Sequence, residues 1–357
     1  MTGATLLTPD DVAAYVVGLE LLGAGGGGDP TIFANALHRA LEPDGIRLHD
    51  PAEFGDAPVV PVAVMGAIRV MAEKLPSGQE IPDAVQALTR WTGIAPSAVV
   101  TVEVGGLNGA VAVLAAAELG LPLLDVDLMG RAFPRVDQTT HAVTGGSLTP
   151  FTMVEPGGRV VLVDQADPTD LGRVVRAVIS QSSGWAGCAF ATFPAARLQH
   201  ASCPGTLTRA LQLGRAHAAA DPATVAADLG GRRLAAGRVL EIARRSSSTF
   251  GRAGIGLLDD SGSVLRLEAE NEYLLAFIDG EPVASTPDLL CVLNRRTAAP
   301  IPVDGLREGD DVTVLVLPGP TWWSATPERL AHVAPCAFGL DCDPVLMARE
   351  PVAEPVA

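Results

Sequence analysis

Residues 98–128 read AVVTVEVGGLNGAVAVLAAAELGLPLLDVDL, and this stretch decides the fold class. Ala98–Val104 is rich in valine and predicts a buried strand, while Gly109–Leu119 is rich in small and apolar residues and predicts a helix. Leu121–Leu128 predicts a second apolar strand. A strand, a helix and a strand in close succession are typical of parallel strands joined by a crossover helix. The sequence therefore predicts an α/β fold.

The same rhythm extends in both directions along the chain. Val59–Val64 predicts an earlier strand, and Ile81–Thr89 predicts a helix after it. We therefore expect an N-terminal three-layer α/β domain with a mostly parallel sheet over residues 1–165. Residues 166–357 predict a second, α+β domain that is β-rich after about residue 237, because short strands there are punctuated by proline and glycine.

Composition excludes several classes of protein. The 357 residues carry a formal net charge of −16, which argues against nucleic acid or an anionic membrane surface as a partner. No apolar run reaches the roughly 18 residues of a transmembrane helix, and no signal peptide is visible, so we expect a cytoplasmic protein. The five cysteines form no Cys-x-x-Cys pair. Cys188 follows a glycine and is a candidate nucleophile, although a buried cysteine is usually a small apolar residue.

A glycine-rich loop lies between two predicted helices near the N-terminus. Gly25, Gly26, Gly27 and Gly28 are followed by Asp29 and a proline, a cap and a first-turn residue for the second helix. Exposed amides in such a loop suit an anion or a ring carbonyl oxygen, so these five residues are candidate substrate-binding residues. The loop follows a helix and lacks the Gly-Lys-Ser/Thr of a phosphate-binding loop, so no nucleotide cofactor is expected.

Polar residues gather where the predicted strands end, which is where ligands bind in parallel sheets. Glu103, Asp125 and Asp127 are candidate catalytic residues, and the two aspartates share one face of a strand. Carboxylates in apolar surroundings can act as a general acid or base, or bind a divalent, zinc-like metal. Pairing with Arg131 in a purely structural role is the alternative. Whether a metal is bound stays open at this point.

Three further residues complete the candidate site. Asn108 follows Glu103 in the turn before the predicted helix and, with Arg131, is a candidate for binding the substrate. His141 follows the second strand and is a candidate base or metal ligand, although a lone histidine is more often structural.

At these residues the chain resembles the S-methyl thiohydantoin desulfurase-like family. The matching segments occur in the expected order and span nearly the whole chain. They are Leu22–Pro30, Glu103–Asn108, Asp125–Pro134, Gly205–Leu207 with Leu213–Ala216, Glu270–Leu274, Pro287–Leu290 and Pro335–Gly339. The resemblance implies an N-terminal α/β domain followed by a β-rich domain. It also implies a genomic neighbourhood of hydantoinase and oxoprolinase genes, and an activity on a five-membered S-methyl thiohydantoin ring.

We therefore expect a hydrolase acting on a cyclic amide-like ring, of hydantoin or S-methyl thiohydantoin type, that releases a thiol or opens a C–N bond. The expected partner is a small-molecule substrate, with a homo-oligomer or a hydantoinase-type partner left open. Two alternatives remain from other classes. One is a non-catalytic partner subunit of a hydantoinase- or oxoprolinase-type complex, and the other is a sensor that binds a small molecule.

Overall fold

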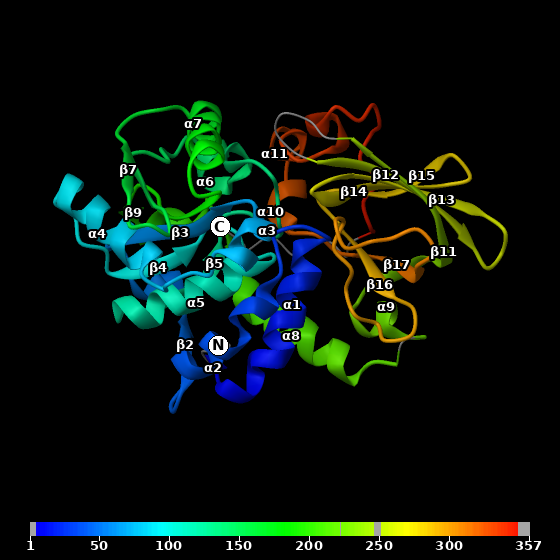
Figure 1. Ribbon diagram of the computed structural model, residues 1–357, viewed down its shortest axis with the longest axis horizontal. Coiled ribbons are helices and arrows are strands. Elements are labelled where there is room, and N and C mark those ends of the chain that lie inside the picture. Colours follow the sequence, from blue (N-terminus) through cyan, green and yellow to red (C-terminus); the bar gives the residue numbers. More distant parts are fainter. Residues whose placement is uncertain (1–4, 222, 246–250, 349–357) are drawn as a thin grey trace, which may run out of the picture. The chain divides into compact units, whose positions relative to one another are not determined.

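The structure is a computed structural model that describes residues 5–221, 223–245 and 251–348. It divides into two compact units, Met1–Ala220 and Asp221–Ala357. Figure 1 shows the helices and strands of both units. Each unit has its own sheet and its own hydrophobic core.

A ten-stranded sheet forms the centre of the first unit in the described part of the chain. Across the sheet the strands are β1 (Leu6–Leu7), β2 (Ile46–His49), β5 (Leu123–Asp127), β4 (Ala98–Thr101), β3 (Pro58–Gly66), β8 (Trp185–Ala189), β6 (Phe151–Val154) and β7 (Val160–Val163), with β9 (Phe193–Pro194) beside β3 and β10 (Cys203–Pro204) beside β5. The central strands β2, β5, β4 and β3 run parallel. The strands at the margins pair antiparallel.

Helices cover both faces of this sheet. Helix α5 (Leu107–Leu119) joins β4 to β5 and packs on β3 and β4, whereas α7 (Pro168–Gln181) lies on the opposite side in Figure 1. The other helices of the unit are α1 (Val12–Gly23), α2 (Ala34–Leu41), α3 (Ile68–Glu73), α4 (Glu80–Thr92), α6 (Thr140–Val143) and α8 (Thr206–Ala219), with short 3-10 turns at η1 (Pro9–Asp11), η2 (Pro30–Phe33), η3 (Pro51–Glu53), η4 (Val136–Gln138) and η5 (Ala195–Gln199). The predicted three-layer α/β domain with a mostly parallel sheet is confirmed.

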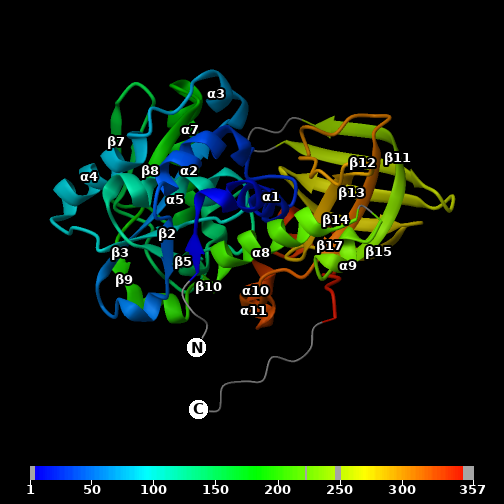
Figure 2. The same cartoon turned by 90° about the horizontal axis from the view of Figure 1, so that it is seen from below.

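Helices α1 and α8 pack side by side although they lie far apart in the sequence (Figures 1 and 2). At Gly18 of α1, a Cβ atom would lie 1.7 Å from the carbonyl oxygen of Ala210 in α8. Only glycine lets the two backbones approach so closely. This packing brings the first turn of α8 to the end of β5, where it takes part in the candidate site.

The predicted domain boundary at residue 165 differs from the boundary between the compact units. Strand β8 pairs with β3, with Val62 opposite Ala189, and α8 packs on α1. Residues 166–220 therefore complete the first sheet and its helical layer. Local sequence cannot show this, because β3 and α1 lie more than a hundred residues before β8 and α8.

The second unit is an antiparallel, β-rich half-barrel, as the short strands after residue 237 predict. Its seven described strands lie in the order β15 (Glu281–Ser285), β14 (Glu272–Ile278), β13 (Val264–Glu270), β12 (Arg252–Asp259), β11 (Arg232–Arg245), β17 (Asp311–Leu317) and β16 (Leu289–Asn294). Alternate residues of β12 and β13, such as Ile255 and Leu267, are buried in the core. The intervening residues point to the other face of the sheet.

Short helices and a C-terminal segment complete the second unit. The helices are α9 (Val225–Asp228), α10 (Thr321–Ser324), α11 (Pro327–Ala331) and the 3-10 turn η6 (Pro335–Phe338). The buried carboxylate of Asp288 accepts hydrogen bonds from the amides of Gly319, at 2.7 Å, and Met347, at 2.6 Å, and so holds the C-terminal segment in place. Throughout both units, the helices that the structure describes are too short or too polar to cross a bilayer.

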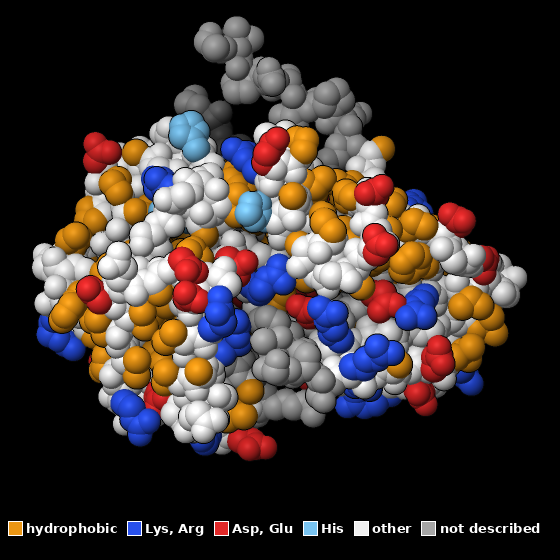
Figure 3. Space-filling view, turned by 90° about the horizontal axis from the view of Figure 1, so that it is seen from above, with side chains coloured by type: hydrophobic (Ala, Val, Ile, Leu, Met, Phe, Trp, Pro, Cys, Tyr) orange, Lys and Arg blue, Asp and Glu red, His pale blue; other side chains and the backbone are white. Residues whose placement is uncertain are grey.

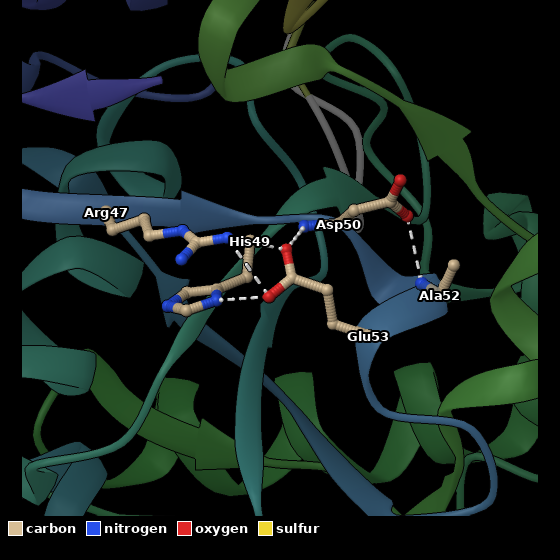
Figure 4. A network of polar contacts seen from close by, with 5 residues as sticks. All are labelled: Arg47, His49, Asp50, Ala52 and Glu53. Carbon is tan, nitrogen blue, oxygen red and sulfur yellow. Dashed lines mark hydrogen bonds and ion pairs between the residues drawn. The ribbon is translucent and has the colours of Figure 1, made fainter. Parts of the chain in front are cut away.

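A surface network fixes the turn after β2 (Figure 4). Arg47 and His49 both contact the carboxylate of Glu53, at 3.0 and 3.1 Å, while the Asp50 carboxylate accepts from the amide of Ala52 at 2.9 Å and caps η3. The hydrogen bond from His49 holds the pKa of Glu53 below its usual value. All of these contacts serve the turn itself, so the network has a structural role.

Candidate functional site

Two glycine turns of the first unit lie against each other. The glycine loop, residues 24–29, contacts the turn between β4 and α5, where the amide of Leu107 donates to the Gly27 carbonyl oxygen at 2.9 Å. A Cβ atom at Gly106 would lie 2.1 Å from that oxygen, and the φ angle of Gly106 is +70°. The short distance to the Gly27 oxygen and the positive φ angle both require glycine at position 106. The glycine loop is therefore fixed against the end of β4.

A third segment, residues 128–134 after β5, joins the same cluster and is here named the arginine loop. The amide of Ala132 donates to the Leu22 carbonyl oxygen, at 3.1 Å, just before the glycine loop. A Cβ atom at Gly105 would lie 2.6 Å from both the Ala132 nitrogen and the Leu22 oxygen. The structure thus brings together the glycine loop and the segments after β4 and β5.

Asp127 holds the arginine loop to the turn after β4. Its carboxylate has no exposure to solvent and accepts from the amides of Val104, at 2.8 Å, and Gly130, at 2.7 Å. Burial raises the pKa of Asp127 to about 7, although these amide hydrogen bonds act to lower it. Both oxygens of Asp127 accept hydrogen bonds from backbone amides, so this side chain holds the turn after β4 and the arginine loop together. When it is ionised, it also places a negative charge close to Glu103.

Glu103 lies at the end of β4 and has side-chain and backbone hydrogen-bond donors around it. It is partly exposed at the residue level, it accepts from Asn108 Nδ2 at 3.0 Å, and the amide of Phe133 binds it as well. Loss of hydration raises the pKa of Glu103 to about 8, and the charge of Asp127 acts in the same direction. The contacts with Asn108, Phe133 and Arg131 lower the pKa. A carboxyl group that titrates near neutral pH is suited to acid–base catalysis.

Asn108, at the start of α5, orients Glu103 and is itself held by strand β3. Its Oδ1 accepts from the amide of Val64 in β3 at 2.7 Å, which leaves its Nδ2 to donate to Glu103. The side chain is buried, so both groups depend on these partners. Glu103 is therefore oriented by β3, by the start of α5 and by the arginine loop.

Arg131 is fully buried within the arginine loop. Its Nε donates to the Ala132 carbonyl oxygen at 3.0 Å, and its guanidinium carbon lies 5.0 Å from the centre of the Phe133 ring. A buried cation stabilises the ionised form of a neighbouring carboxylate, and Arg131 has this effect on Glu103. Its position is consistent with an electrostatic role beside Glu103.

Asp125 shares a strand face with Asp127 but has different partners. Its Oδ1 accepts from the amides of Leu207 and Thr208, both at 3.0 Å, and its Oδ2 accepts from the Thr208 hydroxyl at 2.5 Å. These groups form the first turn of α8, whose amides have no partner within the helix. Asp125 therefore serves as a cap for a helix that lies about eighty residues later in the chain.

His141 lies at the start of α6 in a structural cluster. Arg197 Nε donates to His141 Nδ1 at 3.2 Å, so the ring proton is on Nε2 and donates to the Ser147 carbonyl oxygen, also at 3.2 Å. The ring stacks on Phe193 with 4.1 Å between ring centres. Burial and the charge of Arg197 lower the pKa of His141 to about 4. The imidazole is therefore neutral near pH 7, and both of its nitrogens are occupied.

The glycine loop presents three amides with the potential to bind a ligand. Gly26 donates to the Gly23 carbonyl oxygen at 2.9 Å, so its amide is used within the loop. The amides of Gly25, Gly27 and Gly28 have no acceptor among the residues that the structure describes. Asp29 accepts from the amide of Thr31 at 2.8 Å and caps η2. Three of the four glycine amides thus have no acceptor in the described part of the chain.

Sequence reasoning missed Glu20, which lies one turn before the glycine loop. Burial raises the pKa of Glu20 to about 7, and the nearby charge of Asp29 acts in the same direction. The available signal was a single acidic residue in the otherwise apolar segment Val16–Gly23. Glu20 is therefore a third carboxyl group, after Asp127 and Glu103, whose pKa lies near neutral.

Neither a cysteine nucleophile nor a metal centre is supported by the described residues. Cys188 is buried, and burial raises the pKa of its thiol far above the usual value, so the reactive thiolate is disfavoured. In the described ranges, no group of three or more His, Cys, Asp or Glu side chains could hold a metal ion.

Comparisons with known proteins cover nearly the whole chain. Residues 10–165 match the model of the S-Me-THD-like N-terminal domain, and residues 166–347 match that of the S-Me-THD-like C-terminal domain. A crystal structure of a protein from Chromobacterium violaceum is similar, with 26% sequence identity and a TM-score of 0.76 over 95% of this chain and 98% of that one. No curated protein matches.

Proposed function

The chain belongs to the S-Me-THD-like family, and on this basis we propose that it is a hydrolase acting on a five-membered ring of S-methyl thiohydantoin type. The reaction replaces the S-methyl group on the ring carbon by oxygen and releases methanethiol. The observation that carries the proposal is the Glu103 carboxyl group, whose pKa of about 8 lets it exchange protons near neutral pH. It lies within the cluster formed by the three loops.

The proposed reaction balances with water as the only co-reactant. The protonated Glu103 donates its proton to the ring nitrogen of the C=N bond while a water oxygen attacks the adjacent carbon. The attacking water then returns one proton to Glu103. When the tetrahedral intermediate collapses, the C–S bond breaks, the sulfur takes a proton from Glu103, and the hydroxyl proton returns to Glu103. The products are a ring carbonyl with an N–H group, and methanethiol.

The surrounding groups stabilise charge in this scheme. The amides of Gly25, Gly27 and Gly28 can donate to the ring carbonyl oxygen, where electron density rises during the attack. Arg131 stabilises the glutamate that forms when Glu103 has given up its proton. Asp127 holds the turn after β4 against the arginine loop through its hydrogen bonds from the amides of Val104 and Gly130. Asp125 and His141 have no part in the scheme.

The proposal is tested by measuring thiol release from an S-methyl thiohydantoin by the full chain. We expect Glu103→Gln to lower kcat by about 10²–10⁴-fold, the usual contribution of a general acid or base. Glu73→Gln is the matched control, because Glu73 is an exposed glutamate at the end of α3. It should keep wild-type kcat.

Two results would overturn the proposal. Unchanged thiol release by Glu103→Gln would remove Glu103 from the chemistry. Absence of thiol release by the folded wild-type chain would reject the substrate class and favour the non-catalytic alternatives.

A further inference from the structure

A hollow of about 210 Å³ lies on the second unit, over the sheet face formed by β11, β12 and β13. It combines arginine and glutamate side chains of these strands with apolar residues from β14, from η6 and from the segment after η6. Two segments singled out in the sequence, Glu270–Leu274 and Pro335–Gly339, meet here. Arg252 joins them, because it donates to Glu270 at 2.8 Å and to the Phe338 carbonyl oxygen at 2.9 Å.

Two arginines face each other directly at one end of this hollow. Arg245 of β11 is the cross-strand partner of Arg252 of β12, so both side chains lie on the same face of the sheet. Like charges in this arrangement repel each other and destabilise a sheet. Such a pair is stabilised when an anion lies between or beside the two cations.

Among the residues that the structure describes, the ion pairs in the hollow leave one positive charge uncompensated. Arg252 is paired with Glu270 at 2.8 Å, and Arg266 with Glu268 at 2.6 Å. Arg245 has no ion pair or hydrogen bond with any residue in the described ranges. The three arginines and two glutamates therefore sum to a single positive charge, which matches one carboxylate.

The floor of the hollow is bare because Gly254 lies there. A Cβ atom at Gly254 would be 3.5 Å from Arg266 Nη2 and 3.7 Å from Glu268 Oε2, which is ordinary contact. A larger side chain would therefore fit and would occupy the space above the sheet. The apolar part of the lining comes from Leu274, Phe338 and Leu340. The hollow thus offers a cation beside an apolar surface.

We propose that this hollow is a binding site for a small organic monocarboxylate whose apolar body contacts Phe338 and Leu340. The carboxylate binds Arg245, whose charge no residue in the described ranges compensates. A polyanion is a poor fit, because the chain carries a net charge of −16 and Figure 3 shows acidic and basic side chains interspersed on the face that it draws. The site belongs to the second unit and does not depend on the chemistry proposed for Glu103.

The test is calorimetric titration of the full chain with 3-phenylpropionate, which carries one carboxylate and one apolar ring. The neutral 3-phenylpropanamide and acetate serve as comparison ligands. We expect saturable binding of 3-phenylpropionate, and at least about tenfold weaker binding of each comparison ligand. The amide lacks the hydrogen bond between charged groups, which contributes about this factor, and acetate lacks the apolar ring, whose burial contributes at least as much.

Two variants locate the binding. Arg245→Gln removes the uncompensated charge and should weaken binding about tenfold. Gly254→Val fills the floor and should abolish binding, and its thermal unfolding should stay near wild type because a β-branched residue suits a strand. Arg238→Gln is the control, because Arg238 is an exposed arginine of the same strand outside the hollow. It should bind like wild type.

Three outcomes would overturn the proposal. These are no saturable binding to the wild-type chain, equal binding of the neutral amide, and binding to a folded Gly254→Val variant as tight as to wild type. None of them depends on thiol release, so failure here is distinguishable from failure of the proposed hydrolase function.

Discussion

Asn108 Nδ2 donates a hydrogen bond to Glu103 Oε2 at 3.0 Å while Asn108 Oδ1 accepts one from the amide of Val64 at 2.7 Å. One buried amide side chain therefore links β3 to the carboxyl group at the end of β4. This link connects the stability of the first unit with the protonation of Glu103, and the first prediction follows from it.

Asn108→Ala should lower stability and raise the pKa of Glu103. The substitution leaves the Val64 amide without its acceptor, which costs about 1–3 kcal/mol. It also removes a hydrogen bond that lowers the pKa of Glu103, so the value should rise above the wild-type value of about 8. Urea unfolding measures the first effect, and NMR titration of the glutamate carboxyl carbon measures the second. An unchanged titration would contradict the positioning role of Asn108.

Glu103 should make the protein less stable as the pH rises from about 4.5 to about 8. Its pKa is raised from 4.5 to about 8 in the folded state, so over this range the folded chain holds a proton that the unfolded chain has lost. The free energy of unfolding therefore falls with increasing pH. Glu103→Gln should remove this contribution, so the difference from wild type should grow with pH. Unfolding curves at pH 5 and pH 8 would check it, and parallel pH dependence of the two proteins would refute it.

Asp125 and Asp127 should respond differently to substitution although they lie two residues apart. Asp125→Ala removes a cap from α8 and should cost about 0.5–2 kcal/mol of stability with kcat retained. Asp127→Asn places an amide group among the backbone amides of Val104 and Gly130, so it should disturb the loops around Glu103 and lower both stability and kcat. Thermal unfolding and thiol release measured on both variants would separate the two roles. A loss of kcat in Asp125→Ala with unchanged stability would reverse the assignment.

The cysteines should react with iodoacetamide according to their burial. Cys336 is exposed, whereas Cys188, Cys203 and Cys291 are buried. Burial also raises the pKa of Cys188 and Cys203 well above the usual value, which disfavours the reactive thiolate. Mass spectrometry should find Cys336 labelled in the native protein and the three buried cysteines labelled only in urea. Rapid native labelling of Cys188 would restore it as a candidate nucleophile.

Local pattern predicted much of the fold. The spacing of apolar residues within 98–128 reflects how each short segment buries one face, and this depends on neighbours in the sequence. The short strands after residue 237 could likewise be predicted from the local sequence pattern. Nothing local shows that β8 pairs with β3 or that α8 packs on α1, and these contacts place residues 166–220 in the first compact unit. The predicted division at residue 165 coincides with the boundary between the two matched family domains.

Some features of the candidate site also follow from the local sequence, whereas others depend on the tertiary structure. The sequence by itself indicated that Glu103 and Asn108 follow a strand of a parallel sheet, and hence that they belong at the edge where the strands end. Only the tertiary structure brought the glycine loop, which follows a helix, against this edge. Only the tertiary structure decided that Asp125 caps α8 and that Arg197 and Ser147 occupy His141. The physical reason is that hydration, charge and hydrogen-bond partners set the chemistry of a side chain, and most of these partners come from distant parts of the chain.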